Sequence, residues 1–310
     1  MIRIQNLTKK FGNLHAVENL NLEVGPGEIF GFIGPNGAGK TTTIRMLATL
    51  LEPDDGTAWI DGCCIRTQKR EVRRKIGYMP DYFGVYDGVT VWEYLDFFAR
   101  AYRIPARTRK STIQDCIKLT DFEKLSDKLV SSLSKGMKQR LCLAKTLLHD
   151  PKVLILDEPA SGLDPRARIE FRSLLKELAG MGKTICISSH ILTELSDVVT
   201  TVGIIEKGKM VLTGSPSQIS KTISACLPVS IAIWRPERTE EAKAILKSFP
   251  EVVDVRAQGA VLEIEYGGKE EQLHRLIKGL VDREIPVVGV SCKAKDLEEI
   301  FMAVTRGEVS

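Results

Sequence analysis

The chain has 310 residues, of which 43% are hydrophobic and 27% are charged, and its formal net charge is +4 at pH 7. This length and composition are typical of a globular protein with one large domain or two unequal domains. They argue against a transmembrane protein, because no apolar run approaches the ~18 residues of a membrane span, and the weak charge gives no indication of a nucleic-acid partner.

Short β-rich runs, separated by Gly and Pro turn signals, occupy residues 1 to about 65. We predict strands there, because β-branched and other apolar residues cluster or alternate between the turns. We expect these strands to build the sheet that carries the phosphate-binding loop. The predicted strands are Ile2–Leu7, Asn21–Val24, Ile29–Ile33 and Thr57–Ile60.

A glycine-rich segment, GPNGAGKTT, follows the third predicted strand, and Gly34, Gly39, Lys40 and Thr41 stand at the spacing of a phosphate loop. A strand that leads into such a turn and then into a helix points backbone N–H groups and the positive helix end at one place. The pattern predicts that the lysine contacts the β and γ phosphates and that the threonine hydroxyl binds Mg²⁺. A glycine-rich turn without a ligand is the alternative, although a chance match is expected on the order of once per hundred chains. The other predicted phosphate-binding residues are Asn36, Gly37, Ala38 and Thr42.

Six Lys and Arg residues follow within ten positions. Helical spacing gathers several of them on one side. A solvated face is the ordinary interpretation, and contact with the anionic cytoplasmic leaflet or with acidic loops of a membrane partner is the alternative. The residues are Arg66, Lys69, Arg70, Arg73, Arg74 and Lys75.

The period of the apolar residues becomes helical from Val91 to about Leu129. One face of this helical region carries apolar side chains, and the segment LSKGMKQR, residues 133–140, comes directly after the region. The apolar residues of the face are Val91, Tyr94, Leu95 and Phe98.

The aliphatic run Val153–Leu156 ends in two acids, Asp157 and Glu158. Such a run is typical of a buried parallel strand, and ligands of open α/β sheets bind beyond the carboxyl ends of the strands. We expect Asp157 to hold Mg²⁺ and Glu158 to orient or deprotonate the attacking water. Adjacent side chains on a strand point to opposite faces, so a turn imposed by Pro159 is needed to bring the second acid to the site. A solvated acidic loop is the alternative for this pair.

These segments, in this order, resemble the ATP-binding subunit of an ABC transporter. LSKGMKQR resembles the signature sequence of that family, and SGLD, residues 161–164, resembles its dimer-contact loop. The resemblance implies that Ser134 and Gly136 act in trans, on the γ phosphate held by a second copy. It also implies that His190 contacts the γ phosphate, and that Phe11 stacks on adenine, for which any flat aromatic ring suffices. A structural histidine and an ordinary core aromatic are the alternatives.

Two positions depart from the family pattern. Asp81 stands where the family usually has glutamine, and Lys135 and Met137 replace Gly and Gln in the signature. A carboxylate can still ligate Mg²⁺, so Asp81 stays a candidate metal ligand, but it adds negative charge beside the triphosphate. We expect function to survive the signature changes, since Ser134 and Gly136 are kept.

The chain beyond about residue 225 reads as β-α-β-β-α-β, the split-βαβ, ferredoxin-like order. The motif DLEEIF near its end narrows the resemblance to ATPases of type-2 ABC exporters, of the drug-resistance and lipid-export kind. We expect a small α+β accessory domain at 225–310 that ends in the helix DLEEIFMAV. It is either a passive extension or a clamp that regulates the dimer.

We therefore expect an α/β phosphate-loop NTPase core at 1–220, with an antiparallel β subdomain and a helical signature subdomain at about 90–135. The resemblance implies an ATPase that uses ATP and Mg²⁺, pairs with a second copy or a related subunit, and energises a separately encoded permease. Such a protein is cytoplasmic and peripheral on the inner face of the membrane, in keeping with an N-terminus that lacks a signal peptide. The alternatives are a soluble ABC ATPase acting on ribosomes or nucleic acid and a poorly hydrolysing nucleotide switch.

Overall fold

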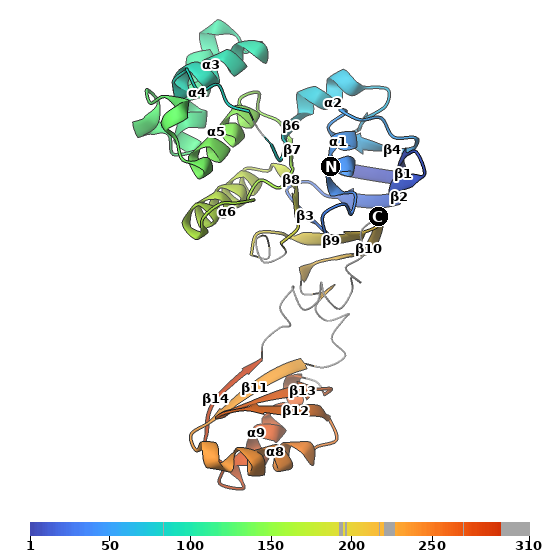
Figure 1. The fold of residues 1–310 in the computed structure, drawn as a ribbon, viewed down its shortest axis with the longest axis vertical. Helices are drawn as coiled ribbons and strands as arrows, with labels where there is room; N and C mark the ends of the chain where they lie inside the picture. The colour runs from blue at the N-terminus through green and yellow to red at the C-terminus, as the bar shows by residue number, and fades with distance from the viewer. Residues whose placement is uncertain are drawn as a thin grey trace. The chain divides into compact units, whose positions relative to one another are not determined.

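The chain divides into two compact units after Pro216, as the computed structural model in Figure 1 shows. The structure describes residues 1–82, 84–191, 195, 197–216, 218–219, 227–268 and 270–292. Within these ranges, none of the helices combines the length and the apolar character that crossing a bilayer requires.

An antiparallel sheet of four strands, in the order β2-β1-β4-β5, forms one part of the N-terminal unit. Its long hairpin joins β1 (Ile2–Phe11) to β2 (Leu14–Val24), with Gly12 at a φ of 59° in the turn. A two-residue connection allows only antiparallel pairing. Three of the four predicted strands therefore lie in this separate sheet, and only Ile29–Ile33 joins the sheet that carries the phosphate loop. The other two strands are β4 (Asp55–Ile60) and β5 (Cys63–Cys64).

A second sheet of six strands, in the order β10-β9-β3-β8-β7-β6, forms the centre of this unit. Every residue of β3, β7 and β8 is buried, which explains the continuous apolar runs of β3 and β7. All neighbours pair in parallel except β9 and β10, so the carboxyl ends of the parallel strands meet at one edge. The strands are β3 (Ile29–Ile33), β6 (Ile76–Met79), β7 (Val153–Leu156), β8 (Thr184–Ser189), β9 (Thr201–Glu206) and β10 (Lys209–Gly214).

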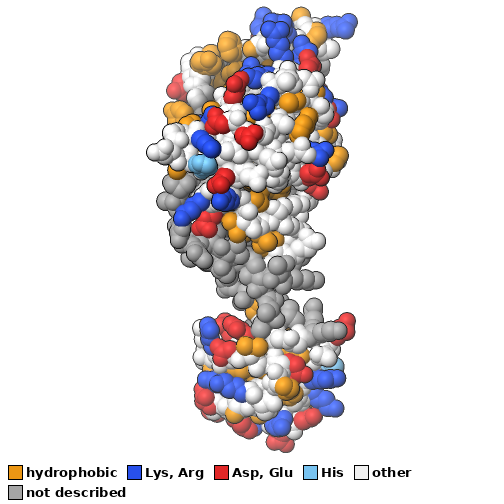
Figure 2. Space-filling view, turned by 90° about the vertical axis from the view of Figure 1, so that its right-hand side faces the viewer, with side chains coloured by type: hydrophobic (Ala, Val, Ile, Leu, Met, Phe, Trp, Pro, Cys, Tyr) orange, Lys and Arg blue, Asp and Glu red, His pale blue; other side chains and the backbone are white. Residues whose placement is uncertain are grey.

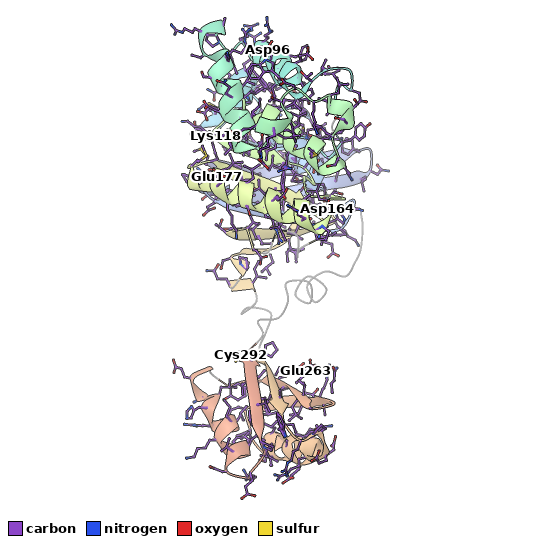
Figure 3. All side chains as sticks on the ribbon, turned by 90° about the vertical axis from the view of Figure 1, so that its left-hand side faces the viewer. Asp96, Lys118, Asp164, Glu177, Glu263 and Cys292 are labelled. Atoms are coloured by element: carbon purple, nitrogen blue, oxygen red, sulfur yellow. The ribbon has the colours of Figure 1, made fainter. Side chains whose placement is uncertain are left out.

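The helices α3, α4 and α5 gather at one side of the N-terminal unit (Figure 1). Thr90 begins α3 (Val91–Ala101) with a reciprocal capping box to Glu93, and the predicted apolar face of this helix is buried apart from the half-buried Phe98. Figure 3 shows Asp164 at the start of α6, where its side chain accepts a hydrogen bond from Ala167 N–H. The remaining helices are α1 (Lys40–Leu47), α4 (Ala106–Leu119), α5 (Lys135–Leu147) and α6 (Pro165–Gly180), and most of the helix expected after Ile191 falls outside the described residues.

The basic stretch forms α2 (Lys69–Lys75), and most of its cations bind groups of the same chain. Arg73 bonds Thr49, and Lys75 lies 2.9 Å from Asp61. On the face shown in Figure 2, basic and acidic side chains are interspersed. These contacts favour the interpretation of the basic stretch as an ordinary solvated face. The other pairs are Arg66 with the Gly56 carbonyl, Lys69 with Glu52, and Arg74 with Glu71.

The C-terminal unit has the predicted β-α-β-β-α-β order and an antiparallel sheet in the order β12-β13-β11-β14. This strand order confirms the ferredoxin-like arrangement. Its core consists of apolar side chains of the sheet and of α8 and α9, which lie on one face of the sheet (Figure 1). The helix expected at its end lies outside the described residues. The elements are β11 (Leu227–Ile233), α8 (Thr239–Lys247), β12 (Val252–Gln258), β13 (Val261–Tyr266), α9 (His274–Val281) and β14 (Val287–Cys292).

Candidate functional site

The phosphate loop connects the end of β3 to the start of α1, as the sequence predicts. Gly39 has a φ of 104°, and a Cβ there would collide with the carbonyl oxygen of Ala16. A Cβ at Gly34 would meet the carbonyl oxygen of Ile205 in the same way. The glycines of the pattern are therefore required by backbone conformation and by close packing, independently of any ligand.

Lys40 is 5% exposed and lies inside the loop that precedes it. Its Nζ donates hydrogen bonds to the carbonyls of Gly34, at 2.7 Å, and Pro35, at 3.1 Å. It also lies 3.5 Å from Oε1 of Glu158. Burial lowers the pKa of Lys40, and the neighbouring Glu158 opposes that shift. The ammonium group of Lys40 is thus held at the loop by two neutral carbonyl acceptors and one carboxylate.

Asp157 stands directly after β7 and is 1% exposed. Its Oδ1 accepts hydrogen bonds from Thr41 Oγ1, at 3.1 Å, and from Ser188 Oγ, at 2.8 Å. Burial raises the pKa of Asp157, while the two hydroxyl donors oppose the shift. Two of the three predicted metal ligands, Thr41 in α1 and Asp157 directly after β7, therefore lie in direct contact.

Glu158 adopts a φ of 47°, a left-handed conformation that is rare for a residue of this type. The turn that brings the second acid to the site is therefore at Glu158 itself. Its carboxylate lies between Lys40 and His190, whose Nδ1 is 2.8 Å from Oε2. Ser188 Oγ accepts a hydrogen bond from the Glu158 N–H at 2.8 Å.

Ser188 is the residue of the site that the sequence did not single out. Its hydroxyl joins Asp157 to the backbone of Glu158, at the end of β8. Its only signal in the sequence is its place two residues before His190, at the end of an apolar strand.

A groove of about 330 Å³ runs from the hairpin β1-β2 to the phosphate loop. Phe11, which is 50% exposed, lies on this groove, and Lys9 Nζ is 5.6 Å from its ring centroid. The groove is lined by four segments of the chain and includes most of the predicted nucleotide-binding residues. It is lined by Phe11, Leu14, Ala16, Asn36, Gly37, Ala38, Gly39, Lys40, Thr41, Thr42, Asp81 and Glu158.

Ser134 and Gly136 do not line this groove. Ser134 is exposed and caps α5, where its hydroxyl accepts a hydrogen bond from the Met137 N–H at 3.3 Å. Gly136 packs so tightly that a Cβ would lie 3.1 Å from Ala167 Cβ and 3.2 Å from Leu163 Cδ2. Within one chain, the signature residues are thus separate from the phosphate loop.

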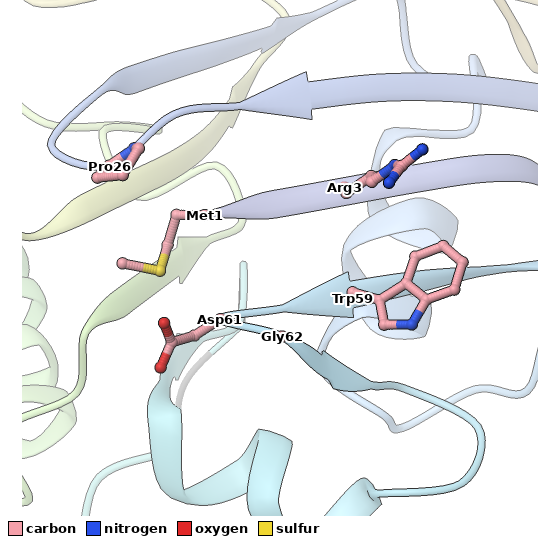
Figure 4. Close-up of a pocket in the computed structure, with 6 residues that line it drawn as sticks. All are labelled: Met1, Arg3, Pro26, Trp59, Asp61 and Gly62. Carbon is pink, nitrogen blue, oxygen red and sulfur yellow. The ribbon is translucent and has the colours of Figure 1, made fainter.

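A larger pocket of about 520 Å³ lies on the antiparallel sheet, beside Met1, Arg3 and Trp59 (Figure 4). Its polar groups already have partners, because the N-terminal amine binds the Val24 carbonyl and Asp61 pairs with Lys75 and Lys152. This pocket is therefore a weaker candidate than the groove, although it is larger.

Comparisons with known proteins agree with the geometry. The family described as "ABC transporter" matches residues 17–161. The "Nod factor export ATP-binding protein I" of Burkholderia pseudomallei (strain 1710b) is 31% identical over 308 residues, which cover 99% of this chain and 98% of that protein. The chain belongs to the ABC transporter ATP-binding proteins. The "Bacitracin transport ATP-binding protein BcrA" of Bacillus licheniformis is 34% identical over 310 residues, with coverage of 99% and 98%.

Solved ABC cassettes have the same fold. A dimeric structure of the cassette MJ0796, in a post-hydrolysis state bound to ADP and Pi, matches with a TM-score of 0.62 and 25% identity, covering 69% of this chain and 98% of that one. The predicted family, fold class and ATPase activity are confirmed. The chain is an ATP-hydrolysing subunit of an ABC transporter, and the alternatives of a soluble ATPase acting on ribosomes or nucleic acid and of a poorly hydrolysing nucleotide switch receive no support.

Proposed function

We propose that this ABC ATPase powers an exporter, through ATP-driven closure of two copies that is coupled to a separately encoded permease. Two relatives that align over nearly the whole chain support this proposal. One is named for Nod factor export, which supports the direction, and the other for bacitracin transport, which supports a role in transport. The proposal places the protein on the inner face of the cell membrane, with a second copy or a related ATPase as its partner. The transported substrate is recognised by the permease.

The observation that carries the proposal is the cluster at the carboxyl ends of β3, β7 and β8. It brings together Lys40, Asp157, Glu158 and His190, from three strand ends that lie side by side. In open α/β sheets this edge is the place where ligands bind. Phosphoryl transfer needs positioning and charge stabilisation more than covalent chemistry, and this cluster supplies both.

Mg²⁺ fits the oxygen donors of this cluster. Thr41 Oγ1 and Asp157 Oδ1 lie 3.1 Å apart, and hard oxygen donors are the ligands that Mg²⁺ prefers. Burial raises the pKa of Asp157, and a divalent cation would offset the cost of burying its charge. When bound, Mg²⁺ neutralises charge on the triphosphate. Asp81, on the rim of the groove, is the third candidate ligand.

The remaining residues have distinct roles in this proposal. Lys40 binds the β and γ phosphates, which replace the carbonyls of Gly34 and Pro35 as its acceptors. Glu158 orients the attacking water and accepts its proton, and His190 holds the Glu158 carboxylate and contacts the γ phosphate. Phe11 stacks on adenine, while backbone N–H groups of Asn36 to Thr42 bind the phosphates.

The signature residues act on the nucleotide of the second copy. Ser134 lies at the N-terminal end of α5, where the helix dipole favours an anion, and it is exposed. Ser134 and Gly136 thus contribute to a site that one chain cannot complete. We assign residues 1–220 to the ATP-binding domain, with its helical subdomain at about 90–135, and 225–310 to an accessory domain.

Glu158→Gln tests this proposal. The variant is expected to bind ATP and to accumulate as a dimer, because it keeps the size of the side chain and removes the proton acceptor. Size-exclusion chromatography with and without Mg-ATP measures the dimer, and an ATPase assay measures turnover. Glu177→Gln, on the exposed face of α6, is the matched control and should behave as the unmodified chain. Normal turnover by Glu158→Gln would show that another group activates the water.

A further inference from the structure

The two departures from the family pattern introduce opposite charges. Asp81 replaces a neutral glutamine and adds one negative charge, whereas Lys135 replaces a glycine and adds one positive charge. They lie on different segments of the chain, one on the groove and one in the signature turn. Their surroundings therefore need to be compared.

Asp81 follows β6 and lines the groove beside Lys40, Thr41 and Glu158. It is close enough to Asp157 for its charge to contribute to the raised pKa of that buried carboxyl. Among the residues that the structure describes, no cation lies within ion-pair distance of Asp81. The groove is thus lined by two carboxylates, Asp81 and Glu158, beside the buried Asp157, and Lys40 is paired with Glu158 instead of Asp81.

Lys135 is the first residue of α5, directly after Ser134, and it is exposed. Its Nζ lies against Gly162, in the space that a Cβ at this position would occupy. Gly162 has a φ of 67° and belongs to the SGLD loop, so this loop leaves room for the ammonium group. No carboxylate of the described chain pairs with Lys135 either. The ammonium group therefore lies beside Gly162 of the SGLD loop, without an ion-pair partner among the described residues.

We propose that Lys135 of one copy offsets the negative charge that Asp81 adds beside the nucleotide bound to the second copy. This inference rests on the proposed closure of two copies over shared ATP. Closure brings the signature turn of one copy toward the groove of the other, which is lined by Asp81 and Glu158 and lies beside the buried Asp157. The two charges that lack an ion-pair partner within one chain, Lys135 and Asp81, then lie near each other across the two copies. The positive charge of Lys135 lowers the electrostatic cost of Asp81 in the closed dimer.

Two effects of Lys135 need to be separated. Contact with Gly162 within its own chain depends on the length of the side chain, whereas the proposed effect depends on its charge. Lys135→Met keeps an unbranched side chain of similar length and removes the charge, and Lys135→Arg keeps the charge. Asp81→Asn removes the opposite charge at nearly constant shape.

A double-mutant cycle in the Glu158→Gln background tests the inference. The measurement is the Mg-ATP concentration that gives half-maximal dimer formation. In the Asp81 background, Lys135→Met is expected to raise this concentration about tenfold, which corresponds to ~1.4 kcal/mol. In the Asp81→Asn background, the same change is expected to raise it by less than about threefold, since coupled pairs are not additive. Lys135→Arg should stay within about threefold of the parent.

Lys138→Met is the matched control, because Lys138 lies on the same helix but pairs with Asp87 of its own chain, at 3.3 Å. Its effect should be the same with and without Asp81→Asn. An equal effect of Lys135→Met in both backgrounds would overturn the inference and assign Lys135 a role within its own chain. If the parent variant binds ATP and never dimerises, the proposed closure itself is wrong, and the inference is wrong with it.

Discussion

The two units of the chain differ in what they bury. In the N-terminal unit, Lys40, Asp157 and Ser188 are buried in contact with one another or with Glu158, and Glu158 has a left-handed backbone. In the described part of the C-terminal unit, Thr239 is the one buried polar side chain. Burial of charge costs stability unless a partner offsets it. The comparison indicates that the first unit is organised around a ligand and the second around its own apolar packing.

Among the substitutions that test this comparison, Lys40→Met is expected to have the largest effect, which is on ATP hydrolysis. The variant loses the cation that binds the β and γ phosphates, so kcat/KM for ATP hydrolysis should fall by about 10³-fold, the scale of removing a preorganised electrostatic contact. Its folding should be preserved, since a neutral side chain suits the buried position. Lys243→Met, on α8 of the C-terminal unit, is the control, and an ATPase assay with thermal unfolding compares them. Equal activities would remove the functional distinction between the units.

Glycine substitutions test whether the strained backbone belongs to the site. Gly39→Ala places a Cβ against the Ala16 carbonyl at a φ of 104°, so we expect loss of ATP binding and a stability cost of ~1–3 kcal/mol. Gly259→Ala, in the turn between β12 and β13, has a φ of 60° and open space around the new methyl group. It should cost ~1 kcal/mol and leave ATP binding intact. Denaturant unfolding and nucleotide titration measure the two effects, and an equal cost at both positions would contradict the close packing at Gly39.

The sequence indicates the positions of the phosphate-loop residues more directly than it indicates the pairing of the strands. Gly34, Lys40 and Asp157 are found from spacing, because a phosphate loop and a strand end fix their positions locally. The partner of β1 is not predictable in this way, since pairing with β2 and β4 depends on a turn and on distant residues. The orientation of Glu158 depends on one backbone torsion angle that no residue pattern reports.

The C-terminal unit shows the complementary case. Its strands and helices follow from apolar alternation and helical period, and their order is confirmed, but no residue in it has a motif that indicates chemistry.

Deletion of residues 221–310 tests the clamp hypothesis for this unit. We expect ATP binding by the monomer to be unchanged and ATP-driven dimerisation to weaken by about tenfold, the loss of one interaction of ~1.4 kcal/mol. Unchanged dimerisation and unchanged transport with the permease would identify the unit as a passive extension.

The smallest expected effect concerns the cost of burying Asp157. Because burial raises its pKa, the folded state binds the proton more tightly than the unfolded state, and stability from this group is lost as pH rises through the unfolded and then the folded pKa. Asp157→Asn removes this cost and keeps an acceptor for Thr41 and Ser188. Without nucleotide at pH 7, the variant should therefore be more stable by ~1 kcal/mol, the usual gain from relieving such a site.

Binding of Mg-ATP should reverse the order of stability, so that the unmodified chain becomes more stable than Asp157→Asn. The carboxylate of Asp157 then gains a divalent cation, which the amide cannot hold as well, so ligand binding stabilises the unmodified chain more than the variant. Thermal unfolding at pH 5 and pH 8, with and without Mg-ATP, measures the stability of both proteins, and Asp254→Asn, at a half-buried position of β12, is the control. If Asp157→Asn lowers the stability without nucleotide, the hydrogen bonds that the carboxylate accepts from Thr41 and Ser188 contribute more to stability than its burial costs. Asp157 would then stabilise the fold independently of ligand binding.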